Sequence, residues 1–226
     1  MWGDVLAQYP EASAGLLNRA LLRYESGDLD GAETDLSDMI RLWPLDANAY
    51  GKRAVIRSQR GNLEAAIADI TKAISLAPSA WSFVNRGSMR VAADDLHEAE
   101  SDFSRALSID PDHLRAYSKR AWTRGALGDH RGALADYSAV ISRAPSWAEG
   151  HLGIAGAYQR LGDLGLARES LGRAIALDPA YPPAYIHRAE VLMQQGETQA
   201  ACLDLARAVK LGAQYADSAL AKHCGN

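Results

Sequence analysis

The sequence predicts an all-α fold, a solenoid of stacked antiparallel helix hairpins. The first observation is a period of 34 residues: prolines stand at 10, 44, 78, 111, 145 and 179, with separations of 34, 34, 33, 34 and 34. The second is that each period contains two stretches with apolar residues at i, i+3, i+4 and i+7, the spacing of amphipathic helices. A fixed period of this length is typical of repeat architectures, in which each unit packs on its neighbours.

The two stretches of each unit are separated by a turn signal. Glycine suits the left-handed residue after a helix, and Asp or Asn caps the free N–H groups of the next helix. The third unit replaces the glycine by Asp94, followed by Asp95. The other turns are predicted at Gly27-Asp28, Gly61-Asn62, Gly128-Asp129, Gly162-Asp163 and Gly196-Glu197.

The units start at Ser13, Ala47, Ala80, Leu114, Ala148 and Pro182 when each proline from Pro44 onward is counted as position 32. The predicted repeats are therefore 13–46, 47–79, 80–113, 114–147, 148–181 and 182–215. Small residues let two helices approach closely, and a large apolar residue fills the space beside them. Position 8 is small (Ala20, Ala54, Gly87, Ala121, Ala155, Ala189), position 20 is alanine (Ala32, Ala66, Ala99, Ala133, Ala167, Ala201), and position 24 is large (Leu36, Ile70, Phe103, Tyr137, Leu171, Leu205).

This pattern resembles the tetratricopeptide repeat, which has a small residue at position 8, alanine at position 20, a large residue at position 24 and proline at position 32. The resemblance implies a right-handed superhelix with a concave groove, over a single solenoid of residues 1–226. Residues 1–12 are expected to be a trailing half-repeat, because Pro10 also obeys the period. Residues 216–226 are expected to cap the last apolar face, as terminal repeats require.

Composition narrows the function classes. The chain has 24 Lys and Arg against 28 Asp and Glu, a formal net charge of −4, which disfavours nucleic acid as a partner. No apolar run is long enough for membrane insertion, and no signal peptide stands at the start, so we expect a soluble chain, cytoplasmic by default.

Cys202 and Cys224 lack metal-site spacing and are expected to be one helix thiol and one tail thiol; no metal or cofactor is predicted. No catalytic arrangement is recognisable, so the prediction is that the chain is not an enzyme.

Charged residues recur at two positions beside the packed faces. Position 7 is Arg and position 23 is Asp in five units, and both charges are missing from the fifth, which has Ile154 and Ser170. A partly buried charge is costly without a partner, so loss of both together favours a structural ion pair. The predicted pairs are Arg19–Asp35, Arg53–Asp69, Arg86–Asp102, Arg120–Asp136 and Arg188–Asp204.

The opposite face of each first helix is the candidate peptide-binding groove. At about 100° per residue, positions 2, 5, 9, 12 and 13 cluster away from the packed face. Apolar residues recur there, and a contiguous exposed apolar stripe commonly marks a partner site; partial burial by neighbouring helices is the alternative. The candidate peptide-binding residues are Leu17, Asn18, Leu21, Val55, Val84, Asn85, Ser88, Val91, Arg115, Lys119, Trp122, Leu152 and Gly156.

Two features refine this groove. Asn85, Arg115 and Lys119 match part of the carboxylate-gripping pattern of some tetratricopeptide domains, but Gly51 and Val55 stand where a lysine and an asparagine are wanted. The resemblance therefore implies only an incomplete clamp. Gly150, Gly153 and Gly156 lie three apart in a predicted helix, which favours either room for a partner or closer helix packing. Trp122 is expected to stand beside this glycine trough.

The leading functional hypothesis is a protein-interaction module or scaffold that binds a peptide or short helix in the groove. Apolar contacts would come from residues such as Trp122, and Arg115 with Lys119 would select an acidic residue. A self-associating structural solenoid, a possible homo-oligomer, is one alternative. The other is a non-catalytic repeat domain of a larger enzyme or regulatory protein.

Overall fold

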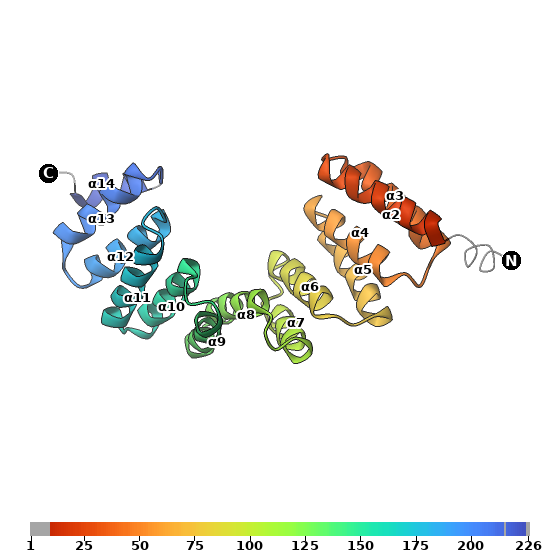
Figure 1. Cartoon of the computed structure of the whole chain (residues 1–226). Helices are drawn as coiled ribbons and strands as arrows, with labels where there is room; N and C mark the ends of the chain where they lie inside the picture. The colour runs from red at the N-terminus through yellow and green to blue at the C-terminus, as the bar shows by residue number, and fades with distance from the viewer. Residues whose placement is uncertain (1–9, 215, 225–226) are drawn as a thin grey trace. The chain divides into compact units, whose positions relative to one another are not determined.

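The structure is a computed structural model that describes residues 10–214 and 216–224, and all regular structure within these ranges is helical (Figure 1). The prediction of an all-α repeat fold is confirmed. The described helices are α2 (Pro10–Glu25), α3 (Leu29–Leu42), α4 (Ala47–Gln59), α5 (Leu63–Leu76), α6 (Ala80–Ala92), α7 (Leu96–Ile109), α8 (Leu114–Ala126), α9 (His130–Arg143), α10 (Ala148–Leu161), α11 (Leu164–Leu177), α12 (Pro182–Gln194), α13 (Thr198–Lys210) and α14 (Ala216–Cys224).

Consecutive helices pack as hairpins, as the period predicts. Helix α2 packs on α3, α4 on α5, α6 on α7, α10 on α11, and α12 on α13. Side-chain bonds between Arg120 and Asp136 join α8 to α9. The chain divides within α8 into two compact units, residues 1–116 and 117–226. Unit 1 holds the first three hairpins and unit 2 the last three with α14, and the single solenoid of residues 1–226 stays a prediction.

The predicted turn residues have the backbone conformation that the turns require. Gly27, Gly61, Gly128, Gly162 and Gly196 all have φ between 80° and 88°. Asp94 takes the same place in the third unit with φ 64°, and it alone among the described non-glycine residues has positive φ. The next helix is capped by a carboxylate or amide oxygen in three hairpins, at Asp28, Asn62 and Asp129.

The repeat positions predicted to be interior form the core. Ala32, Ala66 and Ala99, at position 20, are fully buried. Leu36, Ile70 and Phe103, at position 24, are at most 1% exposed. Gly87 shows why position 8 must be small, because a Cβ there would lie 2.7 Å from Cε1 of Phe103. Sequence alone therefore identified the interior residues of these three hairpins, whereas Tyr137, at position 24 of the fourth, is half-buried.

The ends differ in part from the expectation. Helix α2 begins at Pro10, so residues 10–12 continue into the first helix of the first hairpin rather than ending an earlier one. A proline fits this place, since the first turn of a helix needs no N–H from it. Residues 1–9 of the expected half-repeat lie outside the described residues. At the other end, α14 packs through Ala216, Ala219 and Leu220 on the apolar cluster of the last hairpin.

The five predicted Arg–Asp pairs all form. In each, arginine Nε donates to Oδ2 and Nη2 to Oδ1 of the aspartate 16 residues later, over 2.7–3.0 Å. In the fifth hairpin the Ser170 hydroxyl instead donates to the carbonyl of Leu166, so no charge is left unpaired. Arg120 therefore joins the two helices of its hairpin through Asp136.

A second arginine, four residues after the first, reaches the same carboxylate in four hairpins, and the sequence analysis did not identify it. Arg90 Nη1 lies 2.6 Å from Asp102 Oδ2, and Arg57 Nη1 lies 2.8 Å from Asp69 Oδ2. Residues four apart share a helix face, so the arginines at positions 7 and 11 could have been predicted to reach the same aspartate. The other two are Arg23 on Asp35 and Arg124 on Asp136.

These ion pairs affect the ionisation of their members. The hydrogen bond to Asp69 raises the pKa of Arg53 and outweighs the opposing effect of burial. The bond to Asp204 does the same for the pKa of Arg188. Burial raises the pKa of Glu33, but bonds from Arg57 and Arg60 outweigh it and leave the pKa below its ordinary value. The arginines thus stay charged beside partly buried carboxylates.

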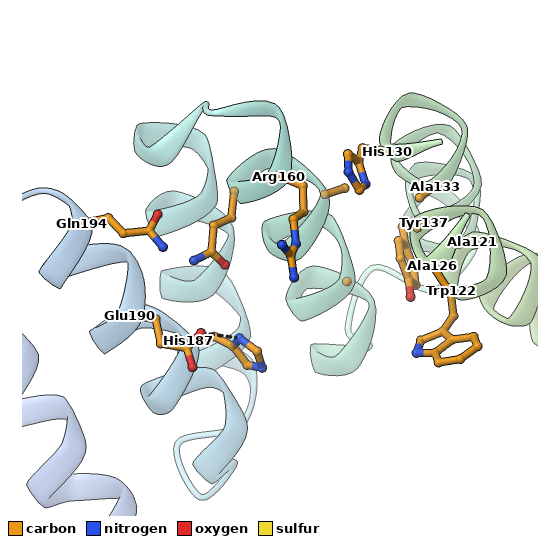
Figure 2. A pocket seen from close by; sticks show the side chains of 15 residues that line it. Ala121, Trp122, Ala126, His130, Ala133, Tyr137, Arg160, His187, Glu190 and Gln194 are labelled. Carbon is orange, nitrogen blue, oxygen red and sulfur yellow. Dashed lines mark ion pairs between the residues drawn. The ribbon is translucent and has the colours of Figure 1, made fainter. Parts of the chain in front are cut away.

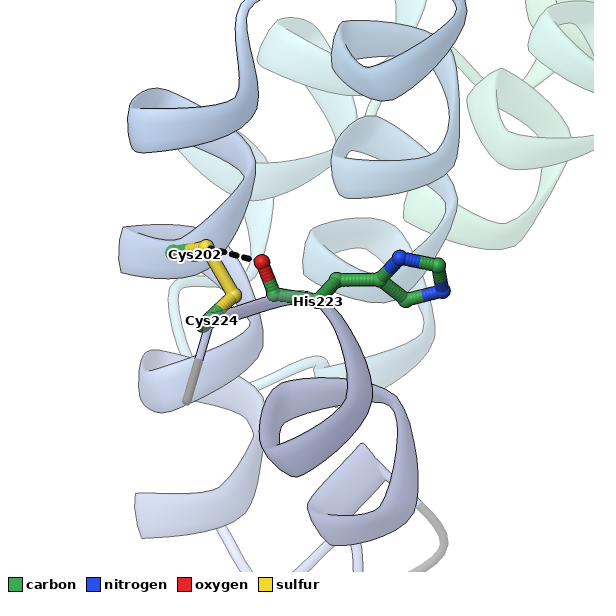
Figure 3. The surroundings of a disulfide bond; sticks show 3 residues. All are labelled: Cys202, His223 and Cys224. Atoms are coloured by element: carbon green, nitrogen blue, oxygen red, sulfur yellow. Dashed lines mark hydrogen bonds between the residues drawn. A yellow bond between two sulfur atoms is a disulfide. The ribbon is translucent and has the colours of Figure 1, made fainter. Parts of the chain in front are cut away.

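The expectation of two free thiols is wrong, because Cys202 and Cys224 form a disulfide (Figure 3). Their Cα atoms are 5.7 Å apart, within the range that a disulfide spans. Helix α13 carries Cys202 and the end of α14 carries Cys224, so the bond ties the last helix to the hairpin that it covers. Sequence spacing gave no sign of it, because the separation of 22 residues becomes a contact only after α14 folds back.

Candidate functional site

A cleft of about 630 Å³ lies in unit 2, on the first-helix side of its hairpins. Its volume falls within the ~300–1,000 Å³ typical of ligand pockets. Helices α8 and α9 form one wall, α10 the floor, and α12 the opposite wall (Figure 2). The lining residues are Ala121, Trp122, Gly125, Ala126, His130, Ala133, Tyr137, Gly153, Gly156, Ala157, Gln159, Arg160, His187, Glu190 and Gln194.

Trp122 is the main apolar group of the cleft. Its side chain stands on α8 and is 53% exposed, although tryptophan is usually well buried. Gly156 lines the same cleft from α10, and a Cβ there would meet nothing within 4 Å. Trp122 thus lines one cleft together with Gly153 and Gly156 of the glycine trough.

The three glycines of the trough have different roles. A Cβ on Gly150 would lie 2.6 Å from Cδ1 of Ile141, and one on Gly153 would lie 2.5 Å from Cε1 of Tyr137. These two glycines let α10 approach α9 closely, so for them the explanation is closer helix packing and not room for a partner. Gly156 alone faces open space, so the room for a partner is confined to the end of the trough near Trp122.

This difference predicts opposite effects of alanine at two glycines of one helix. We expect Gly153→Ala to destabilise unit 2 by about 1–2 kcal/mol, because overpacking against Tyr137 exceeds the gain in helix propensity. Gly156→Ala is the matched control and should stabilise by up to about 1 kcal/mol. Urea denaturation followed by circular dichroism measures both changes, and equal effects of the two variants would contradict the assignment.

Polar groups line the cleft on α9, α10 and α12, and those of α12 stand opposite Trp122 (Figure 2). His187 Nδ1 and Glu190 Oε2 are 3.2 Å apart on α12. The hydrogen bond from His187 lowers the pKa of Glu190, burial of the carboxylate opposes this, and the charges of His187 and Arg160 lower the pKa further. Burial raises the pKa of Tyr137, which keeps its phenol protonated. The cleft therefore combines an indole surface with a wall of hydrogen-bonding groups.

A second, smaller cavity in unit 1 brings together two of the predicted groove residues. Leu21 and Val55 line it with Tyr24 and Trp81. Trp81 is 42% exposed and was not among the predicted site residues. It stands at position 2 of its unit, on the face predicted to line the groove, so the helical projection contained the signal.

The remaining predicted site residues are spread over both units. Val84 is 3% exposed and belongs to the interior, so we omit it from the proposed contact surface. Asn85 Nδ2 donates to the carbonyl of Trp81, and Ser88 Oγ to that of Val84, so both side chains bond to their own helix. Leu17 and Leu152 pack against core clusters of their own hairpins. Asn18 and Arg115 are exposed, while Val91 and Lys119 are half-buried.

Within residues 10–214 and 216–224, no three His, Cys, Asp or Glu side chains are grouped to hold a metal ion. None of the helices described is both long enough and apolar enough to cross a membrane.

Sequence comparison identifies the repeats independently of the structure. Models of the tetratricopeptide repeat match residues 17–80, 118–182 and 152–219 with one profile, and 82–113 with another. The matches fall in all six predicted repeats, extend four residues past the last of them, and together cover most of the chain. A search of curated proteins gave no match.

Solved structures share the fold at low sequence identity. The MamA protein is 22% identical with a TM-score of 0.70, over 75% of this chain and 93% of that one. YrrB, described as having an unusual peptide-binding site, is 19% identical with a TM-score of 0.68, over 81% and 95%. A repeat protein from Parabacteroides merdae is 19% identical with a TM-score of 0.70, over 93% and 98%.

Proposed function

Since this chain belongs to the tetratricopeptide repeat family, a family of protein-interaction scaffolds, we propose that it binds an extended peptide or short helix in the cleft of unit 2. The observation that carries the proposal is the exposed indole of Trp122 beside the open backbone of Gly156. Tryptophan in a cleft is the residue type that most often dominates binding energy at protein interfaces.

The cleft offers a peptide two kinds of contact. An apolar side chain of the ligand packs on Trp122 and over Gly156, where no Cβ obstructs its approach. Backbone amides of the ligand meet the side-chain amides of Gln159 and Gln194, which line the same cleft. One or two such polar groups around an apolar anchor fix the orientation of a ligand.

The predicted groove residues outside this cleft extend the proposal. Lys119 and Leu152 belong to unit 2, and the exposed cation of Arg115 lies at the end of unit 1. The selection of an acidic residue by Arg115 and Lys119 stays a prediction.

We expect Trp122→Ala to weaken peptide binding about 30-fold or more, which corresponds to the ~2 kcal/mol typical of an interface hot spot. The probe is a fluorescein-labelled 12-residue peptide selected from a random phage library on the whole chain, and fluorescence anisotropy gives Kd. Leu203→Ala is the matched control, because Leu203 is 71% exposed on α13 and does not line this cleft.

A second variant tests the cleft by filling it. Gly156→Leu places a side chain in open space, so the fold should be retained while peptide binding falls at least tenfold. Circular dichroism checks the fold of each variant. Unchanged Kd in both Trp122→Ala and Gly156→Leu would show that the peptide binds elsewhere.

A further inference from the structure

Unit 1 contains a cavity of about 190 Å³ between α2, α3, α4 and α6. Ala20, Leu36 and Ile56 lie at its base and are at most 3% exposed. Leu21 and Val55 line it as well, so the surface inside is apolar. Pockets for whole small molecules are typically ~300–1,000 Å³, so this cavity suits one apolar side chain.

Trp81 forms one wall of the cavity, and the sequence of α4 makes room for it. Gly51 lies against the indole, and a Cβ there would be 3.0 Å from Cζ3 of Trp81. The glycine is buried, whereas the tryptophan remains 42% exposed. On another wall, the hydroxyl of Tyr24 accepts a hydrogen bond from Gln59 Nε2 at 2.5 Å, which holds this ring in place. Two aromatic side chains are thus fixed around an apolar hollow.

Lys52 gives the cavity a charge. Its Nζ lies 5.6 Å from the centroid of the Trp81 ring, and Lys52 also lines the cavity. None of the ion pairs found between described residues includes Lys52, whose ammonium group lies over the Trp81 ring. By contrast, the neighbouring Arg53 on the same helix is bound to Asp69 through two nitrogens. The ammonium of Lys52 is therefore available to a ligand.

We infer that this cavity is a second peptide site, which takes a large apolar side chain followed directly by an acidic residue. The apolar side chain enters between Leu21, Val55 and Trp81, and the adjacent carboxylate pairs with Lys52. The charge complementarity at the cavity rim selects this partner over a neutral or basic peptide. The inference rests on the proposed function only in that both sites bind peptides, because this site lies in unit 1 and the cleft of Trp122 in unit 2.

The test uses fluorescein-labelled synthetic peptides of the form Gly-Ser-Gly-X-Z-Gly-Ser-Gly, amidated at the C-terminus, with the whole chain. With X as leucine and Z as glutamate, we expect binding at least tenfold tighter than with Z as lysine or with X as alanine. Lys52→Glu should reverse the preference, so that the leucine–lysine peptide binds tighter than the leucine–glutamate peptide. Trp81→Ala should weaken both, and circular dichroism checks the fold of each variant.

Two results would overturn the inference: equal binding of the leucine–glutamate and leucine–lysine peptides, or an unchanged preference in Lys52→Glu. Trp122→Ala separates this site from the cleft of unit 2, since it should leave the preference for glutamate intact. If Trp122→Ala affects no peptide while Lys52→Glu reverses the preference, the cleft proposal fails and the unit 1 site stands. If Trp122→Ala weakens peptide binding while Lys52→Glu leaves the preference unchanged, the cleft proposal stands and the unit 1 site fails.

Discussion

Asp102→Ala is expected to lower the free energy of unfolding of unit 1 by about 3–5 kcal/mol, the range for breaking a buried ion pair from one side. Asp102 is 2% exposed and accepts bonds from Arg86 Nε and Nη2 and from Arg90 Nη1. Its removal leaves two guanidinium groups beside a packed hairpin without their shared counter-charge. Urea denaturation gives the loss, and hydrogen exchange locates it in α6 and α7.

The fifth hairpin supplies the control for this prediction. There, Ile154 and Ser170 replace the arginine and the aspartate, so the fold accepts loss of both charges together. The double variant Arg86→Ile with Asp102→Ser should therefore be more stable than Asp102→Ser alone. A double-mutant cycle of Arg86→Ala and Asp102→Ala should show a coupling of about 0.5–3 kcal/mol. Additive losses would contradict a structural pair.

Loss of the disulfide is expected to destabilise unit 2 by about 3 kcal/mol in the chain-entropy description of a closed loop of this length. Cys202 and Cys224 are 22 residues apart, and the bond restricts the unfolded chain while holding α14 on α13. The variant with serine at both positions removes the bond without leaving a free thiol. Thermal and urea denaturation of this variant and of the oxidised chain measure the difference.

Reduction provides an independent check on the same bond. A thiol reductant should lower the stability of the unaltered chain to that of the double serine variant, and should leave the variant itself unchanged. Hydrogen exchange should rise first in α14, which then holds to the last hairpin only by the packing of Ala216, Ala219 and Leu220. Equal stability of the oxidised and reduced chains would show that α14 is held by packing alone.

Much of the fold could be predicted from the sequence because the same pattern of residues occurs in each of six repeats. Gly27, Gly61 and Gly128 recur at one position, and a left-handed turn residue is needed there each time. The loss of Arg and Asp together in the fifth unit likewise indicated a pair before any distance was known. The role of Arg90 was not predicted, because the sequence does not show which carboxylate an arginine contacts. The packing of α6 on α7 brings Arg90 to Asp102.

The candidate sites were less accessible to sequence reasoning. Helical projection placed Trp122 and Gly156 on the groove face, but it left open whether the trough of Gly150, Gly153 and Gly156 makes room for a partner or for closer helix packing. Only the packing separates them, because the ring of Tyr137 fills the space beside Gly153 and nothing fills that beside Gly156. Trp81 stood on the same predicted face, but only the packing shows that its ring lies against Gly51 of another repeat and lines a cavity.

The sequence by itself determined the helix hairpins, their turns, the interior positions and the five Arg–Asp pairs, because these rest on local geometry repeated every 34 residues. Tertiary structure alone decided that Cys202 reaches Cys224, that Val84 is buried, and that Lys52 and Trp81 meet at an apolar cavity. These contacts join residues whose separation follows no period, and they form only when one helix packs on another. The ligand-binding surfaces depend on such contacts.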